Sequence, residues 1–216
     1  MNKDATRKLS DHLVNRRDFV KLGGSAAALL ANGTFSQNVF AGRRGRKPKP
    51  KNILLIYTDQ QHIDTIAAGG CQHVVTPALD RIKRSGVSYT KSYSANPVCS
   101  PARSAVFTGR TSCEACVHVN GRPIRPGIPN LGQWFSEHTN YETFYAGKWH
   151  LPRTYTSDIP GFKVINTGIG GFGYLCDTAM SRACEGFLRN RSKSKPFLLT
   201  ASFMQPHDIC EWLRRL

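Results

Sequence analysis

Two apolar runs dominate the hydrophobic pattern of the chain. Ile53–Tyr57 is unbroken and Phe197–Phe203 is nearly so, and each leads into polar residues, 58–61 after the first run and 205–208 after the second. Apolar runs of this length are typical of strands that are buried on both faces of a parallel sheet. Open α/β sheets bind ligands at the carboxyl ends of their strands, so both polar segments are candidates for a functional site.

Helical patterns alternate with these runs. The segment Pro77–Ser85 follows Thr76, a candidate N-cap, and Gly86 is expected to end it. Asn130 is predicted to cap a short helix, and spaced apolar residues predict an amphipathic helix over 174–190.

Two further strands are expected, at 87–94, where apolar and polar residues alternate weakly, and at 141–146. Strands that alternate with helices predict an α/β fold, a parallel or mixed sheet with helices on both of its faces.

Composition permits one substantial core. The chain has 216 residues, 40% of them hydrophobic, and the length allows one domain or at most two. Its net charge of +16 is concentrated in part at 42–51, which holds six of the thirty basic residues. We interpret 42–51 as a solvated basic linker, with a polyanion-binding arm as the alternative. It contains no aromatic residue on which a base could stack, and no nucleic acid partner is expected.

The first 41 residues have the pattern of an export signal. Asn15–Lys21 resembles a twin-arginine motif, and the weakly apolar run that follows, Leu22–Ala31, is too short to span a bilayer. Val39–Ala41 offers small residues for cleavage. The pattern implies the twin-arginine export machinery as a partner and a periplasmic or secreted location.

The chain has seven cysteines, an odd number, and their spacing is not that of a small disulfide scaffold. Cys113 and Cys116 form a lone Cys-x-x-Cys, with His118 nearby as a third possible ligand. We interpret them as ordinary loop residues, and a metal or redox role is the alternative. His62 and His73 are likewise expected to be structural or surface residues.

The segment Pro97–Gly109 carries the strongest chemical signal. Ser100 is predicted to cap a helix that has Pro101 in its first turn and ends at Gly109. Cys99 would then lie at the helix N-terminus, where free N–H groups and the helix dipole favour an anion, and Arg103 would add a fixed charge. The alternative is a buried structural cysteine.

Cys99-Ser-Pro-Ala-Arg103, followed by Thr108-Gly109, resembles the signature of the type I sulfatases of the alkaline-phosphatase-like superfamily, whose Cys-x-Pro-x-Arg cysteine is oxidised to formylglycine. The stretch Gly147–His150 resembles the second sulfatase signature, with Asn140 where a leading glycine is usual. The resemblance implies that the chain is a sulfuric ester hydrolase. It also implies a set of catalytic residues: Cys99, Arg103, Lys148, His150 and His207.

The same resemblance assigns a role to each of these side chains. Cys99 would become the formylglycine nucleophile, and Arg103 and Lys148 would contact the sulfate. His150 would support formylglycine, and His207 would lie near the leaving-group oxygen. The implied partners are a sulfated small molecule or glycan and a formylglycine-generating or anaerobic maturation enzyme.

A divalent cation, Ca²⁺, is also implied by the resemblance. Its ligands would be Asp59, Gln60 and the modified Cys99, with Asp59 matching the family's leading aspartate. Gln60 stands where a second aspartate is common, although an amide oxygen can also bind a hard cation. The related phosphonate monoester hydrolases share this glutamine, which keeps a phosphonate or phosphate ester hydrolase as an alternative.

Residues 52–216 match roughly the first half of the sulfatase catalytic domain. The second metal pair, a further lysine and a smaller antiparallel domain would follow in the family. We therefore expect a truncated domain with impaired activity. The most distant alternative is an exported remnant that binds polyanions without catalysis.

Overall fold

The computed structural model describes residues 49–168 and 173–214. The predicted export signal at 1–41, with most of the predicted linker at 42–51, lies outside the described residues. No helix in the described ranges has both the length and the apolar character needed to cross a membrane.

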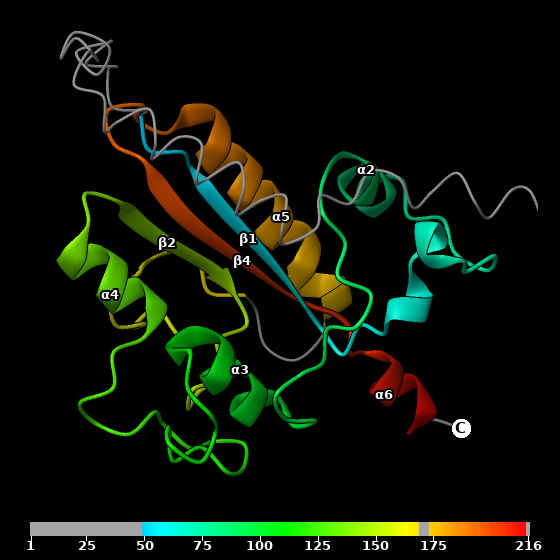
Figure 1. The fold of residues 1–216 in the computed structure, drawn as a ribbon, viewed down its shortest axis with the longest axis horizontal. Coiled ribbons are helices and arrows are strands. Elements are labelled where there is room, and N and C mark those ends of the chain that lie inside the picture. The colour runs from blue at the N-terminus through cyan, green and yellow to red at the C-terminus, as the bar shows by residue number, and fades with distance from the viewer. Residues whose placement is uncertain (1–48, 169–172, 215–216) are drawn as a thin grey trace, which may run out of the picture. The chain divides into compact units, whose positions relative to one another are not determined.

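Four parallel strands form one sheet in the order β1-β4-β2-β3, of which Figure 1 labels the first three. They are β1 (Ile53–Asp59), β2 (Glu142–Gly147), β3 (Lys163–Asn166) and β4 (Phe197–Pro206). The predicted α/β fold with a parallel sheet is confirmed. β3 was not expected, because its four residues carry no clear hydrophobic pattern.

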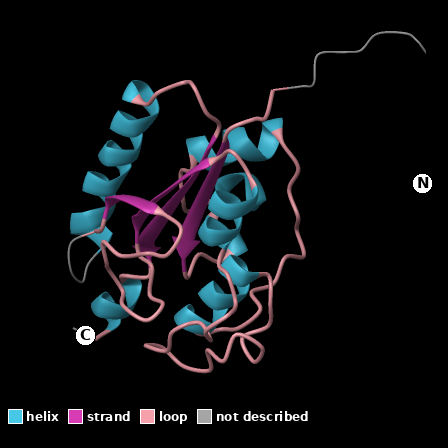
Figure 2. Ribbon diagram, turned by 90° about the vertical axis from the view of Figure 1, so that its left-hand side faces the viewer, coloured by secondary structure: helices cyan, strands magenta, loops and turns pink. Residues whose placement is uncertain are grey.

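Helices cover both faces of this sheet (Figure 2). Successive residues of a strand point to opposite faces, so Leu198 and Leu199 of β4 belong to two different cores. Leu198 packs with residues from α3 (Cys99–Thr108) and α4 (Leu131–His138), and Leu199 packs with α5 (Gly173–Asn190). The larger cluster also contains Phe107, Ala115, Val117, Tyr145, Trp149, Leu151, Ile159 and Phe162.

The helix ends follow local capping chemistry where the side chains are free to provide it. At α4, Asn130 Oδ1 accepts from the backbone N–H of Gln133, and Gln133 Oε1 accepts from that of Asn130, both at 3.1 Å. This reciprocal pair confirms the predicted cap. The helix α2 (Pro77–Ser85) begins after Thr76, as predicted. The Thr76 side chain makes no capping hydrogen bond, because its hydroxyl donates to Asp80 Oδ1 at 2.8 Å.

Short elements complete the described chain. They are the 3₁₀ helices η2 (Ile63–Thr65) and η3 (Ala67–Gly69) and the helix α6 (Ile209–Leu213).

The strand expected at 87–94 is wrong. This segment is a loop, and Val87, Tyr89 and Tyr93 are each about four-fifths exposed. It does not pair with any of the described strands, so its backbone forms no sheet hydrogen bonds there. An alternating pattern is not sufficient for a strand when no neighbouring strand pairs with it.

The predicted N-cap of the cysteine helix is also wrong. The helix α3 begins at Cys99, its N-cap is Val98, and Ser100 is completely buried. The Ser100 hydroxyl donates to the backbone carbonyl of His150 at 2.6 Å, and this distant contact takes the place of the local cap. Gly109 does end the helix, in the left-handed conformation with φ 65°.

Burial differs between the two apolar strands. β4 is buried on both faces, as predicted, because helices cover the two faces of the sheet and β1 and β2 flank the edges of the strand. β1 is an edge strand of the described sheet, and Leu54 and Ile56 are 45% and 47% exposed. The expectation that β1 is buried on both faces is therefore wrong for the described chain.

Candidate active site

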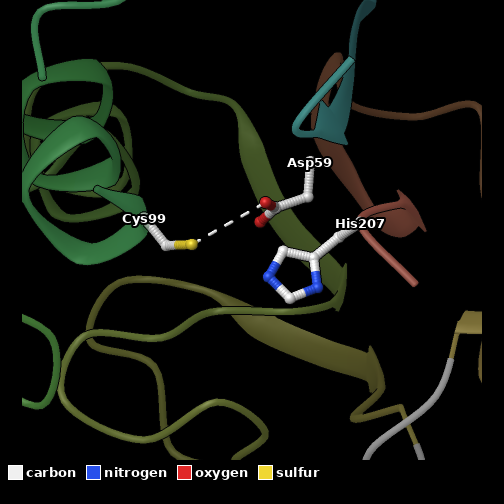
Figure 3. A group of neighbouring side chains, drawn as sticks. All are labelled: Asp59, Cys99 and His207. Atoms are coloured by element: carbon white, nitrogen blue, oxygen red, sulfur yellow. Dashed lines mark hydrogen bonds between the residues drawn. The ribbon is translucent and has the colours of Figure 1, made fainter. Parts of the chain in front are cut away.

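Three elements bring Asp59, Cys99 and His207 together at the carboxyl edge of the sheet (Figure 3). Asp59 ends β1, Cys99 opens α3, and His207 directly follows β4. One ligand-type atom from each side chain lies within 4.8 Å of the other two. The two polar strand ends and the start of the cysteine helix therefore lie together in the structure.

Asp59 is the buried centre of the charges in this site. Its Oδ2 lies 2.8 Å from Arg103 Nη2 and 2.9 Å from Lys148 Nζ, while its Oδ1 faces the Cys99 sulfur at 3.8 Å. All three charged side chains are almost completely buried. Burial alone would raise the pKa of Asp59, but the hydrogen bonds and charges of Lys148 and Arg103 outweigh it and hold the pKa below its ordinary value.

Arg103 is fixed by contacts on several sides. Its Nη1 donates to the backbone carbonyl of Lys148 at 2.7 Å and to Ser202 Oγ at 2.9 Å. Its guanidinium also lies over the ring of Tyr57, 4.9 Å from the centroid. This leaves the arginine little freedom to move, so its charge has a defined position.

Lys148 reaches both the carboxylate and the sulfur. Its Nζ lies 3.8 Å from Cys99 Sγ and 3.6 Å from Met204 Sδ, and its side chain is 2% exposed. Gly147 before it has φ 90°, and its Cα lies so close to the Ser202 carbonyl and Met180 sulfur that a Cβ would collide with both. This close approach brings Lys148 from the end of β2 into the site.

His150 is a neutral base beside two cations. Burial lowers its pKa to about 4, and the charges of Lys148 and Arg103 add to that effect. Its Nδ1 is buried and finds no hydrogen-bond partner among the described residues. At neutral pH this imidazole is therefore uncharged, and its Nδ1 can accept a hydrogen bond.

The N-terminus of α3 offers fewer free N–H groups than expected. The backbone N–H of Val98 donates to Asn96 Oδ1, and that of Ser100 donates to Asn120 Oδ1, both at 2.9 Å. Pro101 has no N–H to offer. An anion here would therefore be held mainly by Arg103 and Lys148.

A polar pocket of about 290 Å³ opens beside this cluster. Its lining includes Asp59, Gln60, Asn96, Cys99 and Arg103. The cavity has room for a small tetrahedral anion next to the sulfur.

Gln60 lines the pocket but is not part of the gathered group. Its backbone has φ 57°, and its amide oxygen accepts from the Cys210 thiol at 3.4 Å. Asp59, Cys99 and His207 together contain a single carboxylate, whereas Ca²⁺ takes six to eight oxygen ligands. These three side chains alone do not fit calcium.

The other candidate ligands lie outside the site. His62, His73 and His118 are exposed, as are Cys113 and Cys116, which are free thiols. None of them joins a metal-binding group within the part of the chain that the structure describes. This agrees with their interpretation as surface and loop residues.

Several supporting residues were not predicted. Ser202 holds Arg103, Asn120 holds the backbone of Ser100, and the Tyr145 hydroxyl donates to the carbonyl of Lys148 at 2.7 Å. A hydroxyl inside an apolar strand could have marked Ser202. Nothing in the local sequence distinguishes Asn120.

The fold and the site define an α/β protein that places a nucleophilic side chain beside two buried cations, an arrangement suited to anionic esters. The sequence matches the family model described as Sulfatase over residues 51–213. The chain therefore belongs to the sulfatase family.

Two curated relatives illustrate the similarity. The chain is 35% identical over 116 residues to N-acetylgalactosamine-6-sulfatase of Homo sapiens, which covers 48% of this chain and 22% of that protein. It is 27% identical over 187 residues to N-acetylglucosamine-6-O-sulfatase of Bacteroides thetaiotaomicron (strain ATCC 29148), which covers 77% of this chain and 32% of that protein. The chain thus spans about a third or less of the length of these relatives.

A solved structure of a 2-O GAG sulfatase has the same fold. It superposes with a TM-score of 0.64 at 24% identity and covers 77% of this chain and 37% of that protein. The fold is accordingly alkaline-phosphatase-like, and the described sheet corresponds to part of the larger sulfatase domain.

Proposed function

We propose that this chain carries the nucleophile and the anion-binding residues of a sulfatase that hydrolyses the sulfate ester of a sulfated sugar. The position of Cys99 carries the proposal, because its sulfur lies 3.8 Å from Lys148 Nζ and opens into the polar pocket. Cations fixed beside a nucleophile offset its repulsion from an anionic ester.

The nucleophile would be formylglycine, made from Cys99 by a formylglycine-generating or an anaerobic maturation enzyme. When present, it supplies a hydrated aldehyde, with one hydroxyl to attack sulfur and a second that allows sulfate to be expelled. The match of Cys99–Arg103 to the family signature supports this assignment.

The chain's own residues would divide the remaining work. Arg103 and Lys148 would bind the equatorial oxygens of the sulfate, and both are already fixed in place by their buried contacts. His150 is uncharged at neutral pH, and its buried Nδ1 would accept a hydrogen bond from the nucleophile. His207 would donate a proton to the leaving alcohol oxygen as its bond to sulfur breaks.

Calcium remains a prediction from the family. Asp59 would contribute Oδ1, and Gln60 would have to release the Cys210 thiol before it could join. Since the gathered donors do not fit calcium, the proposed steps rest on the protein's own side chains.

An amino sugar sulfated at position 6 is the first substrate to test. The relatives described above are named as 6-sulfatases of N-acetylgalactosamine and N-acetylglucosamine. Their names motivate the choice of substrate for this chain.

The experiment is to co-express the full chain with a maturation enzyme and follow two readouts. Mass spectrometry of the Cys99 peptide reports conversion to formylglycine, and sulfate release is assayed with 6-sulfated N-acetylglucosamine and an aryl sulfate. We expect conversion at Cys99 alone, and at most weak hydrolysis, which Cys99→Ala abolishes and Cys116→Ala leaves intact.

Two results would contradict the proposal. An unconverted Cys99 in the presence of an enzyme that converts a control sulfatase would exclude the nucleophile. Faster hydrolysis of an aryl phosphonate than of the aryl sulfate would instead favour a phosphonate ester hydrolase.

Export through the twin-arginine machinery to the periplasm or beyond is part of the same proposal. It rests on the Asn15–Lys21 motif, which lies outside the described residues. Replacing Arg16 and Arg17 with lysine should retain the chain in the bacterial cytoplasm, as cell fractionation would show. Export that persists in the double variant would exclude this route.

A further inference from the structure

We propose that, while Cys99 remains a thiol, Asp59, Cys99 and His207 bind a borderline-soft divalent metal ion, with Zn²⁺ preferred over Ca²⁺. This metal site belongs to the unmodified chain. It is independent of the proposed ester hydrolysis, because it requires the sulfur that formylglycine formation removes.

The spacing of the three side chains suits one small metal ion. Their ligand atoms lie within 4.8 Å of one another, and Asp59 Oδ1 is 3.8 Å from Cys99 Sγ (Figure 3). In a tetrahedral zinc site with a Zn–S bond of about 2.3 Å and a Zn–O bond of about 2.0 Å, the sulfur and oxygen are about 3.5 Å apart. Small side-chain movements are therefore enough to close the site.

Asp59 has one oxygen available for a metal. Both cations converge on Oδ2, at 2.8 Å from Arg103 and 2.9 Å from Lys148. The thiol of Cys99 donates its weak hydrogen bond to Oδ1. On binding, that S–H bond breaks, its proton passes to water, and the sulfur and Oδ1 each form a bond to the metal.

The three side chains supply donor types that zinc binds in proteins. Lys148 lies beside them, with its Nζ 3.8 Å from the Cys99 sulfur. Together, one thiolate, one imidazole and one carboxylate make a three-ligand site with a fourth position open toward the pocket.

The same donors discriminate against calcium. Sulfur and imidazole nitrogen are poor ligands for a hard cation, which takes six to eight oxygens. Arg103 and Lys148 already balance the charge of Asp59, so a cation held by charge alone gains little at this position. A metal ion that bonds to the Cys99 sulfur depends less than Ca²⁺ does on the negative charge of Asp59.

The test is a titration of the full 216-residue chain with Co²⁺, whose bond to a thiolate produces a charge-transfer absorption band. Cys113 and Cys116 are replaced with serine so that this exposed pair cannot bind the probe, and intact mass confirms that Cys99 is a thiol. We expect one equivalent of Co²⁺ to produce the band, Zn²⁺ to remove it, and excess Ca²⁺ to leave it unchanged.

Single variants in the same background locate the metal. Cys99→Ser should abolish the band, and His207→Ala should weaken Co²⁺ binding by about tenfold or more. Cys210→Ser is the matched control, because Cys210 is half-buried near the pocket but bonds to Gln60, and this variant should bind as the parent does.

Protection of the thiol gives a second readout that does not depend on the variants. Zn²⁺ should slow alkylation of Cys99, measured on its peptide by mass spectrometry, and Ca²⁺ should not. The proposal is overturned if the band is absent, if it survives Cys99→Ser, if His207→Ala has no effect, or if Ca²⁺ displaces Co²⁺ at concentrations comparable to Zn²⁺.

Discussion

At the scale of single residues, Asp59 holds the site together. Its carboxylate contacts Arg103, Lys148 and the thiol of Cys99, and it is only 7% exposed. Buried cations are tolerated when they are paired, and the loss of one partner leaves an uncompensated charge.

Asp59→Asn should therefore lower the free energy of unfolding by about 3 to 5 kcal/mol, because Arg103 and Lys148 lose their counter-ion. Urea denaturation measures the change. The exposed Asp158→Asn removes the same charge from the surface and should cost less than about 0.5 kcal/mol. Equal effects of the two variants would show that the buried cations find other partners.

His150 should make stability depend on pH. Its pKa is about 4 in the folded chain and 6.5 in its ordinary state, so between these values the unfolded chain binds a proton that the folded chain does not. Its contribution is complete above about pH 6.5 and is lost as the pH falls toward 4. In this window stability should rise with pH, by at most about 1.4 kcal/mol per unit for this group.

The measurement is the free energy of unfolding at several pH values across that window. His150→Gln should flatten the slope, and the exposed His73→Gln should not. Asp59, whose pKa is lowered below its ordinary value of 3.8, adds to the slope only near the acid end of the window, and it does so in both variants alike. A slope unchanged by His150→Gln would mean that another group titrates.

At the scale of elements, the site depends on the close packing of β2 against β4. Gly147 lies against the Ser202 carbonyl and Met180, and Lys148 leaves β2 directly after it. The backbone N–H of Lys148 donates to the Ser202 carbonyl at 3.0 Å, which continues the sheet into the site.

Two glycine variants separate backbone strain from this close packing. Gly147 and Gly109 both have positive φ, but a Cβ at Gly109 meets nothing within 4 Å. Gly109→Ala should cost about 1 kcal/mol from strain alone. Gly147→Ala should cost at least about 2 kcal/mol more, because the methyl group forces β2 away from β4. Denaturant unfolding compares them, and equal costs would refute the packing argument.

At the scale of the whole molecule, the described sheet has an apolar edge. β1 pairs with β4 and with no other described strand, and Leu54 and Ile56 expose about half of their surface. An exposed apolar edge strand is a site of self-association. The net charge of +16 opposes association by repulsion between copies, and salt screens that repulsion.

The isolated chain should therefore associate more as salt concentration rises, as measured by sedimentation velocity. Leu54→Lys combined with Ile56→Lys should reduce association at every salt concentration, since it adds charge to the edge. Val119→Lys with Val87→Lys adds the same charge at exposed positions outside β1 and should protect less. Equal protection by both pairs would assign the effect to net charge.

Local sequence was sufficient for the family, the α/β class and most helix boundaries. The helix ends follow from interactions between near neighbours, such as the reciprocal cap of Asn130 and Gln133 and the left-handed Gly109. The sequence also places Asp59 and His207 at strand ends and Cys99 at the start of a helix. Parallel strands end at a common edge of a sheet, so the pattern marked both strand ends as candidates, and the family resemblance grouped them with Cys99.

The pairing of these residues, in contrast, is a property of the tertiary structure. Arg103 donates to Asp59, which lies 44 positions earlier in the sequence. The Ser100 hydroxyl donates to the His150 carbonyl, 50 positions later, in place of the expected cap. The Gln60 amide oxygen accepts from the thiol of Cys210, 150 positions later. Such contacts depend on which strands become neighbours, and local propensity contains no information about that. The exposure of β1 has the same origin, because an apolar run specifies a strand and the assembled sheet alone specifies whether that strand lies at its centre or its edge.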